Sequence, residues 1–222
     1  MAPWMWIVAG PNGAGKTTFA GPYLDDLHAA FPELAGPTGI VKLNADERTL
    51  ELRRQFPDAA QVTLNRQAAQ EIDAEVEAMI GAGRSFAVET VLSTPKYRDD
   101  VETAQAKGFQ FGLVYVSLRS AKLSTQRVGE RVRKGGHDVE AAAVVRRYRR
   151  SHEQLSWFAP RADFLMIFDN SDKREGRLPL LLAHHYPGRP FQHVHPGVNR
   201  AVNRAVSAMR QQGPRDPSLG PT

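Results

Sequence analysis

The chain has 222 residues, of which 41% are hydrophobic and 24% charged, a composition ordinary for one folded α/β domain that argues against global disorder. It contains no cysteine, which excludes disulfides, thiolate metal sites and a cysteine nucleophile and makes a reducing cytoplasm the expected location. The formal net charge of +5 arises largely within residues 119–150, where ten Lys or Arg stand against three acids, which fits either phosphate binding or a solvated, arginine-rich helix face.

Apolar, strand-like runs alternate with helix-like segments, which is the pattern of a mainly parallel sheet covered by helices on both faces. The first run, Trp4–Ala9, is too short for a signal peptide or a membrane span, so we expect a buried strand and no membrane association. The sequence therefore predicts an α/β, three-layer domain over residues 1–186. The other expected strands are residues 40–44, 85–89, 110–116 and 163–168, with an edge strand at 178–183, and the expected helices are residues 16–28, 58–80, 96–107, 121–133, 139–156 and 198–210.

Residues 10–17 match the Walker A pattern at every fixed position. Its glycines let successive backbone N–H groups surround the β-phosphate, and the helix that follows adds the positive end of its dipole. We expect Lys16 to reach the β- and γ-phosphates of ATP and the Thr17 hydroxyl to bind Mg²⁺. The predicted nucleotide-binding residues are Gly10, Pro11, Asn12, Gly13, Ala14, Gly15, Lys16, Thr17 and Thr18.

The segment 44–48, Asn-Ala-Asp-Glu-Arg, follows the second expected strand. Ligands of an open α/β sheet bind outside the carboxyl ends of its strands, so Asp46 should face the γ-phosphate. A carboxylate there can accept the proton of an attacking hydroxyl, and Arg48 can hold the acceptor molecule. The sequence equally allows Asp46 to cap the next helix, with Glu47 as an acid of its first turn.

The third expected strand ends in Phe86-Ala87-Val88-Glu89-Thr90. Glu89 could hold magnesium through water or orient the acceptor, and we place Thr90 in the acceptor site beside it. The alternative is a polar strand end that has no chemical role.

Two arginine-bearing helices are expected within the basic segment, with Gly135-Gly136 between them. Two helical arms around a glycine hinge would form a lid, at about residues 119–156, that closes over the triphosphate and supplies positive charge to the transferring phosphoryl group. The arginines are Arg127, Arg131 and Arg133 on the first helix and Arg146, Arg147 and Arg150 on the second.

The late part of the chain carries one further motif. Residues 168–171, Phe-Asp-Asn-Ser, resemble a Walker B strand end, but they come so late that we interpret them as a structural or adenine-side turn. Residues 187–222 form a C-terminal extension rich in Pro, Gly, Arg and His, whose last dozen residues are expected to be disordered.

Taken together, these motifs resemble those of the zeta-toxin family of P-loop kinases, in its short form. The matching features appear in the family's order over residues 4–183. The Walker A motif alone is generic, whereas a Gly-Gly-His-Asp element followed by Arg-Tyr-x-Arg-Ser is more specific. The features are residues 9–19, Asn44-Ala45-Asp46, residues 86–90, Arg127, residues 131–138, residues 147–151 and Asp169-Asn170-Ser171.

The resemblance implies a nucleotide-kinase-like fold that uses ATP and Mg²⁺ and phosphorylates a sugar hydroxyl of UDP-N-acetylglucosamine, with an antitoxin protein as partner in some members. It implies Lys16 and Thr17 at ATP and Mg²⁺, Asp46 as the general base and Glu89 at the acceptor. The larger toxins carry an aromatic residue and then Arg after the base, whereas residues 47–49 here are Glu-Arg-Thr, which points to a different acceptor pocket. The arginines implied to stabilise the transferring phosphoryl group are Arg131 or Arg133 with Arg147 or Arg150.

Three functions compete. The leading one is an ATP-dependent kinase for a nucleotide sugar or a related small molecule. The second is a kinase for nucleic-acid ends or dinucleotides, which the basic segment permits although no aromatic interleaving for stacking bases is evident there. The third is a non-catalytic NTP switch or a motor ATPase, and the missing Leu-Ser-Gly-Gly-Gln signature weakens the transport form of that interpretation.

Overall fold

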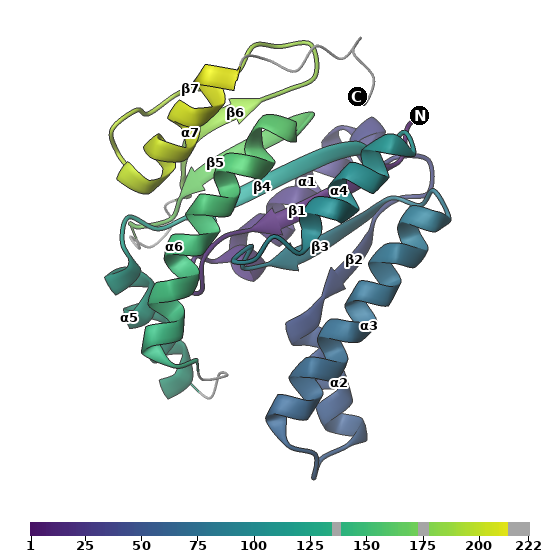
Figure 1. The fold of residues 1–222 in the computed structure, drawn as a ribbon, viewed down its shortest axis with the longest axis vertical. Coiled ribbons are helices and arrows are strands. Elements are labelled where there is room, and N and C mark those ends of the chain that lie inside the picture. The colour runs from purple at the N-terminus through teal and green to yellow at the C-terminus, as the bar shows by residue number, and fades with distance from the viewer. Residues whose placement is uncertain (135–138, 173–177, 213–222) are drawn as a thin grey trace.

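The computed structural model describes residues 1–134, 139–172 and 178–212. Within these residues, seven strands form one sheet in the order β2-β3-β1-β4-β5-β6-β7 (Figure 1). Strands β2 to β5 in this order run parallel, and β6 and β7 add antiparallel pairs at one side. The strands are β1 (Trp4–Ala9), β2 (Val41–Asn44), β3 (Phe86–Thr90), β4 (Gln110–Ser117), β5 (Phe164–Asp169), β6 (Leu180–His185) and β7 (Gln192–His193).

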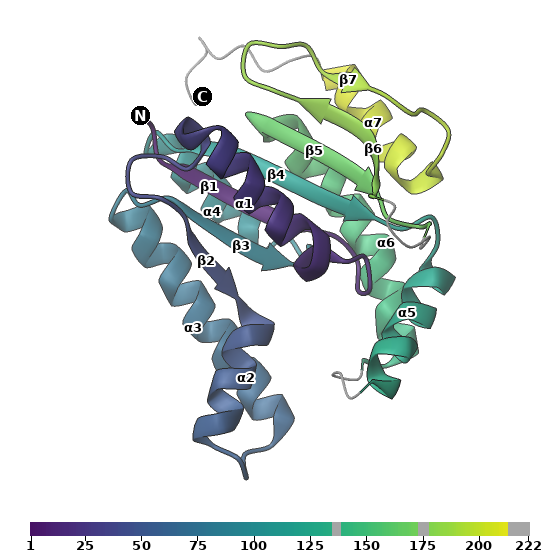
Figure 2. The ribbon, with the colours of Figure 1, turned by 180° about the vertical axis from the view of Figure 1, so that it is seen from behind.

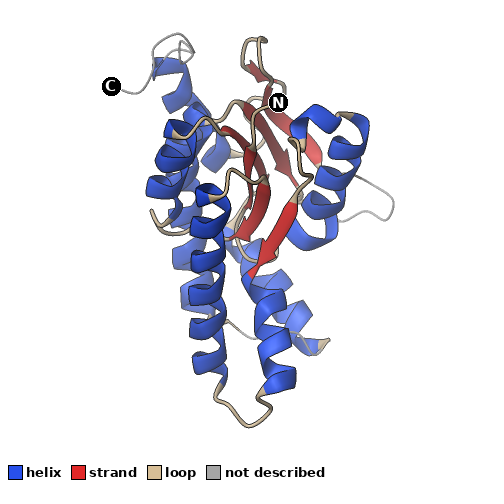
Figure 3. Cartoon of the chain, turned by 90° about the vertical axis from the view of Figure 1, so that its right-hand side faces the viewer, coloured by secondary structure: helices blue, strands red, loops and turns tan. Residues whose placement is uncertain are grey.

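Helices cover both faces of the sheet, which confirms the expected three-layer α/β fold. Helix α1 lies on one face, and α3, α4, α6 and α7 lie on the other (Figures 1 and 2). Seen along the edge, the sheet stands between the two helical layers (Figure 3). The helices are η1 (Lys16–Ala20, π-helical), α1 (Gly21–Ala30), η2 (Pro32–Leu34), α2 (Ala45–Gln55), α3 (Gln61–Gly81), α4 (Tyr97–Ala106), α5 (Ala121–Arg133), α6 (Ala141–Phe158), η3 (Ala159–Arg161) and α7 (Arg200–Gln212).

Strand β1 lies at the centre of the sheet, and all six of its residues are buried. Its side chains alternate between the two layers, so Met5 and Ile7 join the core under α3 and α4 while Trp4 and Trp6 join the core under α1. The Trp6 indole N–H donates to the carbonyl of Leu34 at 3.0 Å, which satisfies its polar atom inside the core. A strand buried on both faces needs this continuous apolar run.

Four elements were not among the strands and helices expected from the sequence: α2, β7 and the short helices η2 and η3. Helix α2 pairs with the first half of α3 and extends beyond the sheet (Figures 1 and 3). Leu52 of α2 packs with Leu64 and Ala68 of α3 in a small cluster apart from the two main cores. Strand β7 pairs with β6, so the predicted edge strand at 178–183 begins later, at Leu180, and is not the edge of the sheet.

The described part of the segment after residue 186 packs against the rest of the protein. Helix α7 contributes Val202, Ala205 and Val206 to the larger core cluster, next to α6. The last ten of the twelve residues expected to be disordered lie outside the described residues. In the described part of the chain, no helix has the length and apolar character needed to cross a membrane.

Gly112 on β4 lies directly beside Trp6 on β1, which makes it a sharp test of the core. A Cβ added at Gly112 would lie 2.3 to 2.5 Å from three ring atoms of Trp6. Because the ring is fully buried and cannot move aside cheaply, we expect Gly112→Ala to lower the free energy of unfolding by about 1–3 kcal/mol. Denaturant-induced unfolding measures this loss.

The matched control is Gly81→Ala at the end of α3, where an added Cβ meets nothing within 4 Å. We expect that variant to be as stable as the parent protein or slightly more stable, since Ala favours a helix over Gly. Equal stability of the two variants would contradict the packing at Gly112.

Candidate active site

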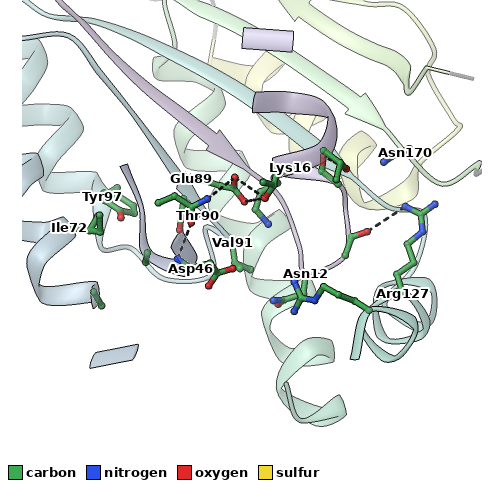
Figure 4. Close-up of a pocket in the computed structure, with 18 of the residues that line it drawn as sticks. Asn12, Lys16, Asp46, Ile72, Glu89, Thr90, Val91, Tyr97, Arg127 and Asn170 are labelled. Carbon is green, nitrogen blue, oxygen red and sulfur yellow. Dashed lines mark hydrogen bonds between the residues drawn. The ribbon is translucent and has the colours of Figure 1, made fainter. Parts of the chain in front are cut away.

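A cavity of about 520 Å³ opens where β1, β2 and β3 end (Figure 4). The chain leaves β1 for β2 on one side of the sheet and later returns to β4 on the other, so the cavity lies at the topological switch point. Open α/β sheets bind their ligands at this point. Its walls come from the loop after β1, the start of α2, the ends of β2 and β3, and α3, α4 and α5.

The loop after β1 is held so tightly that two of its positions admit only glycine. A Cβ at Gly10 would lie 2.1 Å from the carbonyl oxygen of Val116, and Gly10 has a φ of +146°. A Cβ at Gly15 would lie 2.6 Å from the side-chain nitrogen of Asn170, and Gly15 has a φ of +93°. The Walker A glycines therefore shape a loop whose backbone can approach a phosphate closely.

Lys16 begins η1, and its half-buried side chain turns back over the loop, where Nζ donates to the carbonyl of Gly10 at 3.0 Å. Loss of hydration lowers the pKa of Lys16, an effect that Arg131 reinforces and that Glu89 and Asp46 oppose. An ammonium with reduced hydration next to a glycine loop is well placed to pair with phosphate oxygens.

Thr17 and Glu89 meet beside this lysine. The Thr17 hydroxyl donates to the Glu89 carboxylate, with distances of 3.0 and 3.1 Å to its two oxygens, and Asn44 Nδ2 donates to one of them at 3.3 Å. Burial raises the pKa of Glu89, although Lys16 and the Thr17 hydroxyl act in the opposite direction. A hydroxyl and a carboxylate side by side are oxygen ligands of the type that Mg²⁺ takes together with phosphates, so these residues fit the expected ion.

Asp46 lies in the first turn of α2, exposed, and lines the same cavity. The alternative that Asp46 caps this helix is wrong, because Asn44 is the N-cap. The Oδ1 atom of Asn44 accepts from the backbone N–H of Asp46 at 2.9 Å, and Asp46 and Glu47 are both acids of the first turn. The cap thus leaves the Asp46 carboxylate available to the cavity. Thr90 also lines the cavity, while its Oγ1 accepts from the backbone N–H of Leu92 at 3.1 Å.

Arg48 does not line this cavity, in contrast to its expected place at the acceptor. Its guanidinium donates to Glu71 at 2.8 Å and Glu75 at 2.6 Å on α3, and to Glu51 at 3.1 Å on its own helix. These carboxylates raise the pKa of Arg48 further above its usual value. Arg48 therefore joins α2 to α3 and supports the position of Asp46 at the start of α2.

The four arginines expected at the phosphates have different positions. Arg131 of α5 lines the cavity, whereas Arg133, Arg147 and Arg150 are exposed and do not line it. The second half of α6 is built into the core, so a lid could include at most α5 and the first half of α6. The proposed hinge, Gly135-Gly136, lies outside the described residues.

Two residues at the cavity were not expected to contact the glycine loop: Arg127 was placed in the lid and Asn170 in the turn after the fifth expected strand. Arg127 of α5 is 6% exposed, and it donates to the carbonyls of Gly13 and Ser171 over 3.4 Å each. Burial lowers the pKa of Arg127. Asn170 donates to the carbonyl of Ala14 at 2.8 Å. The helical spacing of Arg127 and Arg131 could have identified Arg127, since residues four apart share a helix face.

The cavity wall away from the glycine loop is more apolar than the loop side, and none of the sequence motifs included its residues. Ile72 of α3, Tyr97 of α4 and Val91 line this side (Figure 4). Lys96 lies beside them and forms an ion pair with Asp73. The cavity thus combines a cationic, glycine-lined half with a half that can hold an apolar or ring-shaped group.

The raised pKa of Glu89 predicts that the charged form of this carboxylate lowers the free energy of unfolding, by an amount that depends on pH. The native state holds the Glu89 proton more tightly than the unfolded chain, so stability falls as pH rises through and above about 4.3. Glu89→Gln removes this cost, and we expect its free energy of unfolding, relative to the parent protein, to increase as pH is raised from about 4 to 7.

Denaturant unfolding at several pH values, without nucleotide or metal, measures this difference. Glu102→Gln, at an exposed position of α4, controls for the loss of one negative charge. If the free energy of unfolding of Glu89→Gln relative to the parent protein stayed constant or fell with rising pH, the conclusion that burial destabilises the charged Glu89 would be contradicted.

Two solved structures with the same fold are described as complexes with sulphate ions and with ATP. One chain of the AvrRxo1-ORF1:AvrRxo1-ORF2 complex with sulphate ions matches with a TM-score of 0.69 and 17% identity, over 91% of this chain and 64% of that one. A structure of the same complex with ATP matches with a TM-score of 0.62 and 18% identity, over 99% and 66%. This chain therefore spans slightly under two thirds of these two solved chains, and the likeness confirms the expected P-loop fold.

Two sequence comparisons also match a large part of this chain. An uncharacterised protein of Haemophilus influenzae is 24% identical over 139 residues, which is 63% of this chain and 88% of that protein. The profile of the AAA domain family matches residues 5–155, which include the Walker A loop, Asp46, Glu89 and Arg131. With more than half of its residues matched, this chain belongs to the AAA domain family of P-loop proteins.

Proposed function

We propose that this protein is an ATP-dependent kinase that transfers the γ-phosphate to a hydroxyl of a small molecule. The observation that carries the proposal is that Lys16, Thr17, Glu89 and Asp46 border a single cavity together with two arginines, Arg127 and Arg131. A nucleotide switch needs the first three of these groups but has no use for a carboxylate on the acceptor side. The complex with ATP in a protein of the same fold supports the choice of nucleotide.

The glycine loop and Lys16 would bind the triphosphate, and Asp46 would act as the general base. In the reaction, Asp46 accepts the proton of the acceptor hydroxyl while the oxygen of that hydroxyl forms a bond to the γ-phosphorus. The bond from that phosphorus to the β,γ-bridging oxygen breaks, and ADP leaves. Phosphoryl transfer needs little covalent help from the protein, so catalysis rests on this positioning and on charge.

Thr17 is the proposed Mg²⁺ ligand, with Glu89 next to it as a second oxygen partner or as a holder of metal-bound water. Mg²⁺ held by these residues would neutralise the negative charge that develops on the transferring phosphate. Glu89 and Thr90 would also orient the acceptor at the end of β3. The site of Glu89 suits either role, because its carboxylate borders the cavity between Thr17 and Asn44.

The proposed acceptor is a nucleotide sugar such as UDP-N-acetylglucosamine. The resemblance to zeta toxins supports this class, and so does a cavity with an apolar half beside the bound phosphates. The same resemblance supports an antitoxin as a protein partner. The absence of cysteine supports action in the cytoplasm.

Acceptor-dependent transfer of label tests the proposal. The protein is incubated with γ-labelled ATP and Mg²⁺ and, separately, with UDP-N-acetylglucosamine, a nucleoside, NAD or a short oligonucleotide. We expect label on the nucleotide sugar and a rate lowered by about 10²–10⁴ in Asp46→Asn, because the variant lacks the proton acceptor. ATP binding should be retained.

Asp99→Asn is the matched control, since Asp99 is an exposed acid in the first turn of α4 as Asp46 is in α2. Label on the oligonucleotide, lost steeply with salt, would instead indicate a polynucleotide-end kinase. Label on no acceptor, with ATP bound equally by the parent protein and Asp46→Asn, would overturn the assignment of the base.

The arginine candidates can be separated with a second pair of variants on the same helix. Arg131 lines the cavity and Arg133 does not. We expect Arg131→Ala to lower kcat by about 10²–10³, the effect of removing one group that stabilises transition-state charge, and Arg133→Ala to change it little. Steady-state kinetics with the acceptor found above measures both. A larger loss in Arg133→Ala would show that α5 closes in another orientation.

A further inference from the structure

A buried polar network connects the start of α7 to the end of β5. Asn199, which is 1% exposed, donates through Nδ2 to Asp169 Oδ2 at 2.7 Å and to Ser117 Oγ at 3.0 Å. Its Oδ1 accepts from the backbone N–H groups of Ala201 and Val202 at 3.1 and 3.2 Å. The oxygen of this amide therefore caps α7, and its nitrogen holds the Asp169 carboxylate.

The orientation of the Asn199 amide is determined by its neighbours. Burial lowers the pKa of His152 to about 4, so the ring is neutral, and its Nδ1 lies 2.8 Å from the carbonyl of Tyr148. Because a carbonyl can only accept, Nδ1 carries the proton and Nε2 accepts from the Ser117 hydroxyl at 2.8 Å. The Ser117 oxygen is then free to accept from Asn199, as observed.

The same network reaches the glycine loop through the turn after β5. Asp169 Oδ1 accepts from the backbone N–H of Ser171 at 2.9 Å, and the backbone N–H of Asn170 donates to the carbonyl of Ser117 at 3.0 Å. Between these bonds, the Asn170 side chain donates to the carbonyl of Ala14 at 2.8 Å. One continuous path of hydrogen bonds thus runs from α7 through residues 169–171 to the nucleotide loop.

We propose that Asn199 is a positioning residue for nucleotide binding, which acts through Asp169 to hold Asn170 against the glycine loop. The inference rests on the proposed binding of ATP and adds that α7 completes that site. Asn170 lies beside Gly15 as well as Ala14, so a shift of the turn changes the loop that receives the phosphates. Residues 169–171 and Asn199 all lie after residue 155, where the match to the AAA domain family ends.

Exchanging the two side chains tests this proposal. Asn199→Asp keeps an oxygen to cap α7 but places a second carboxylate against Asp169. Asp169→Asn leaves one oxygen for two donors, the Asn199 amide and the Ser171 backbone N–H, so one of the two hydrogen bonds is lost. We expect each single variant to raise the Kd for the Mg²⁺ complex of AMP-PNP at least about tenfold, the size of one charge-assisted hydrogen bond. The double variant pairs a carboxylate at 199 with an amide at 169, and we expect its Kd to return close to that of the parent protein.

Calorimetric titration gives the four Kd values, and thermal unfolding of the same samples gives their stabilities. Asn65→Asp, at an exposed position of α3, controls for the change of one Asn to Asp. Recovery of affinity in the double variant supports the positioning role. Single variants that bind AMP-PNP as the parent protein does overturn it, and so does a double variant no better than the worse single one.

The remaining outcomes also decide the question. If a single variant does not fold, the double variant decides alone. A Kd near that of the parent protein supports the pairing of residues 199 and 169, and a folded double variant with a Kd raised tenfold or more overturns it. If the parent protein itself binds no AMP-PNP, the proposed kinase function fails first, and with it this inference. Loss confined to the variants concerns Asn199 and Asp169 alone.

Discussion

The half-buried ammonium of Lys16 is the constraint around which the site is arranged. Strand β1, buried on both faces, delivers the glycine loop to the switch point of the sheet, and the loop closes against β4 at Gly10. Lys16 donates a hydrogen bond to the Gly10 carbonyl, and the Glu89 carboxylate lies nearby. Burial reduces the hydration of both charged groups. Phosphates and a metal ion would supply the charges that these groups lack, so the site is preorganised for them.

The parts that the sequence predicted are those whose signals are local. The Walker A loop combines a strand, fixed glycines and a helix within twenty residues, and each strand of the parallel sheet is a compact apolar run. Helix α5 was predicted to its boundary, since Ser120 supplies a visible N-cap whose Oγ accepts from Leu123 at 3.2 Å. Strand β7, with only two residues, carries no such signal.

The parts that the sequence missed depend on partners far along the chain. Helix α2 buries only Thr49 and Leu52, so its apolar pattern is weak, and the cap considered from the sequence was Asp46, whereas Asn44 caps the helix. Arg48 was expected at the acceptor, and its structural role is evident only from its contacts with α3. The positions of Asn170 and Asn199 relative to the glycine loop follow from the packing of β5 and α7, which no motif records.

The separate packing of the α2–α3 pair has a consequence for the evolution of this fold. That pair has its own small apolar cluster, apart from the two cores that support the nucleotide loop, and Arg48 and its glutamates join its two helices from the outside. Mutations in this pair can change the shape of the acceptor side of the cavity without changing the packing of the sheet. In the proposed kinase, such mutations would change which acceptor binds while β1 and the nucleotide loop keep their packing, so the two halves of the site can change separately.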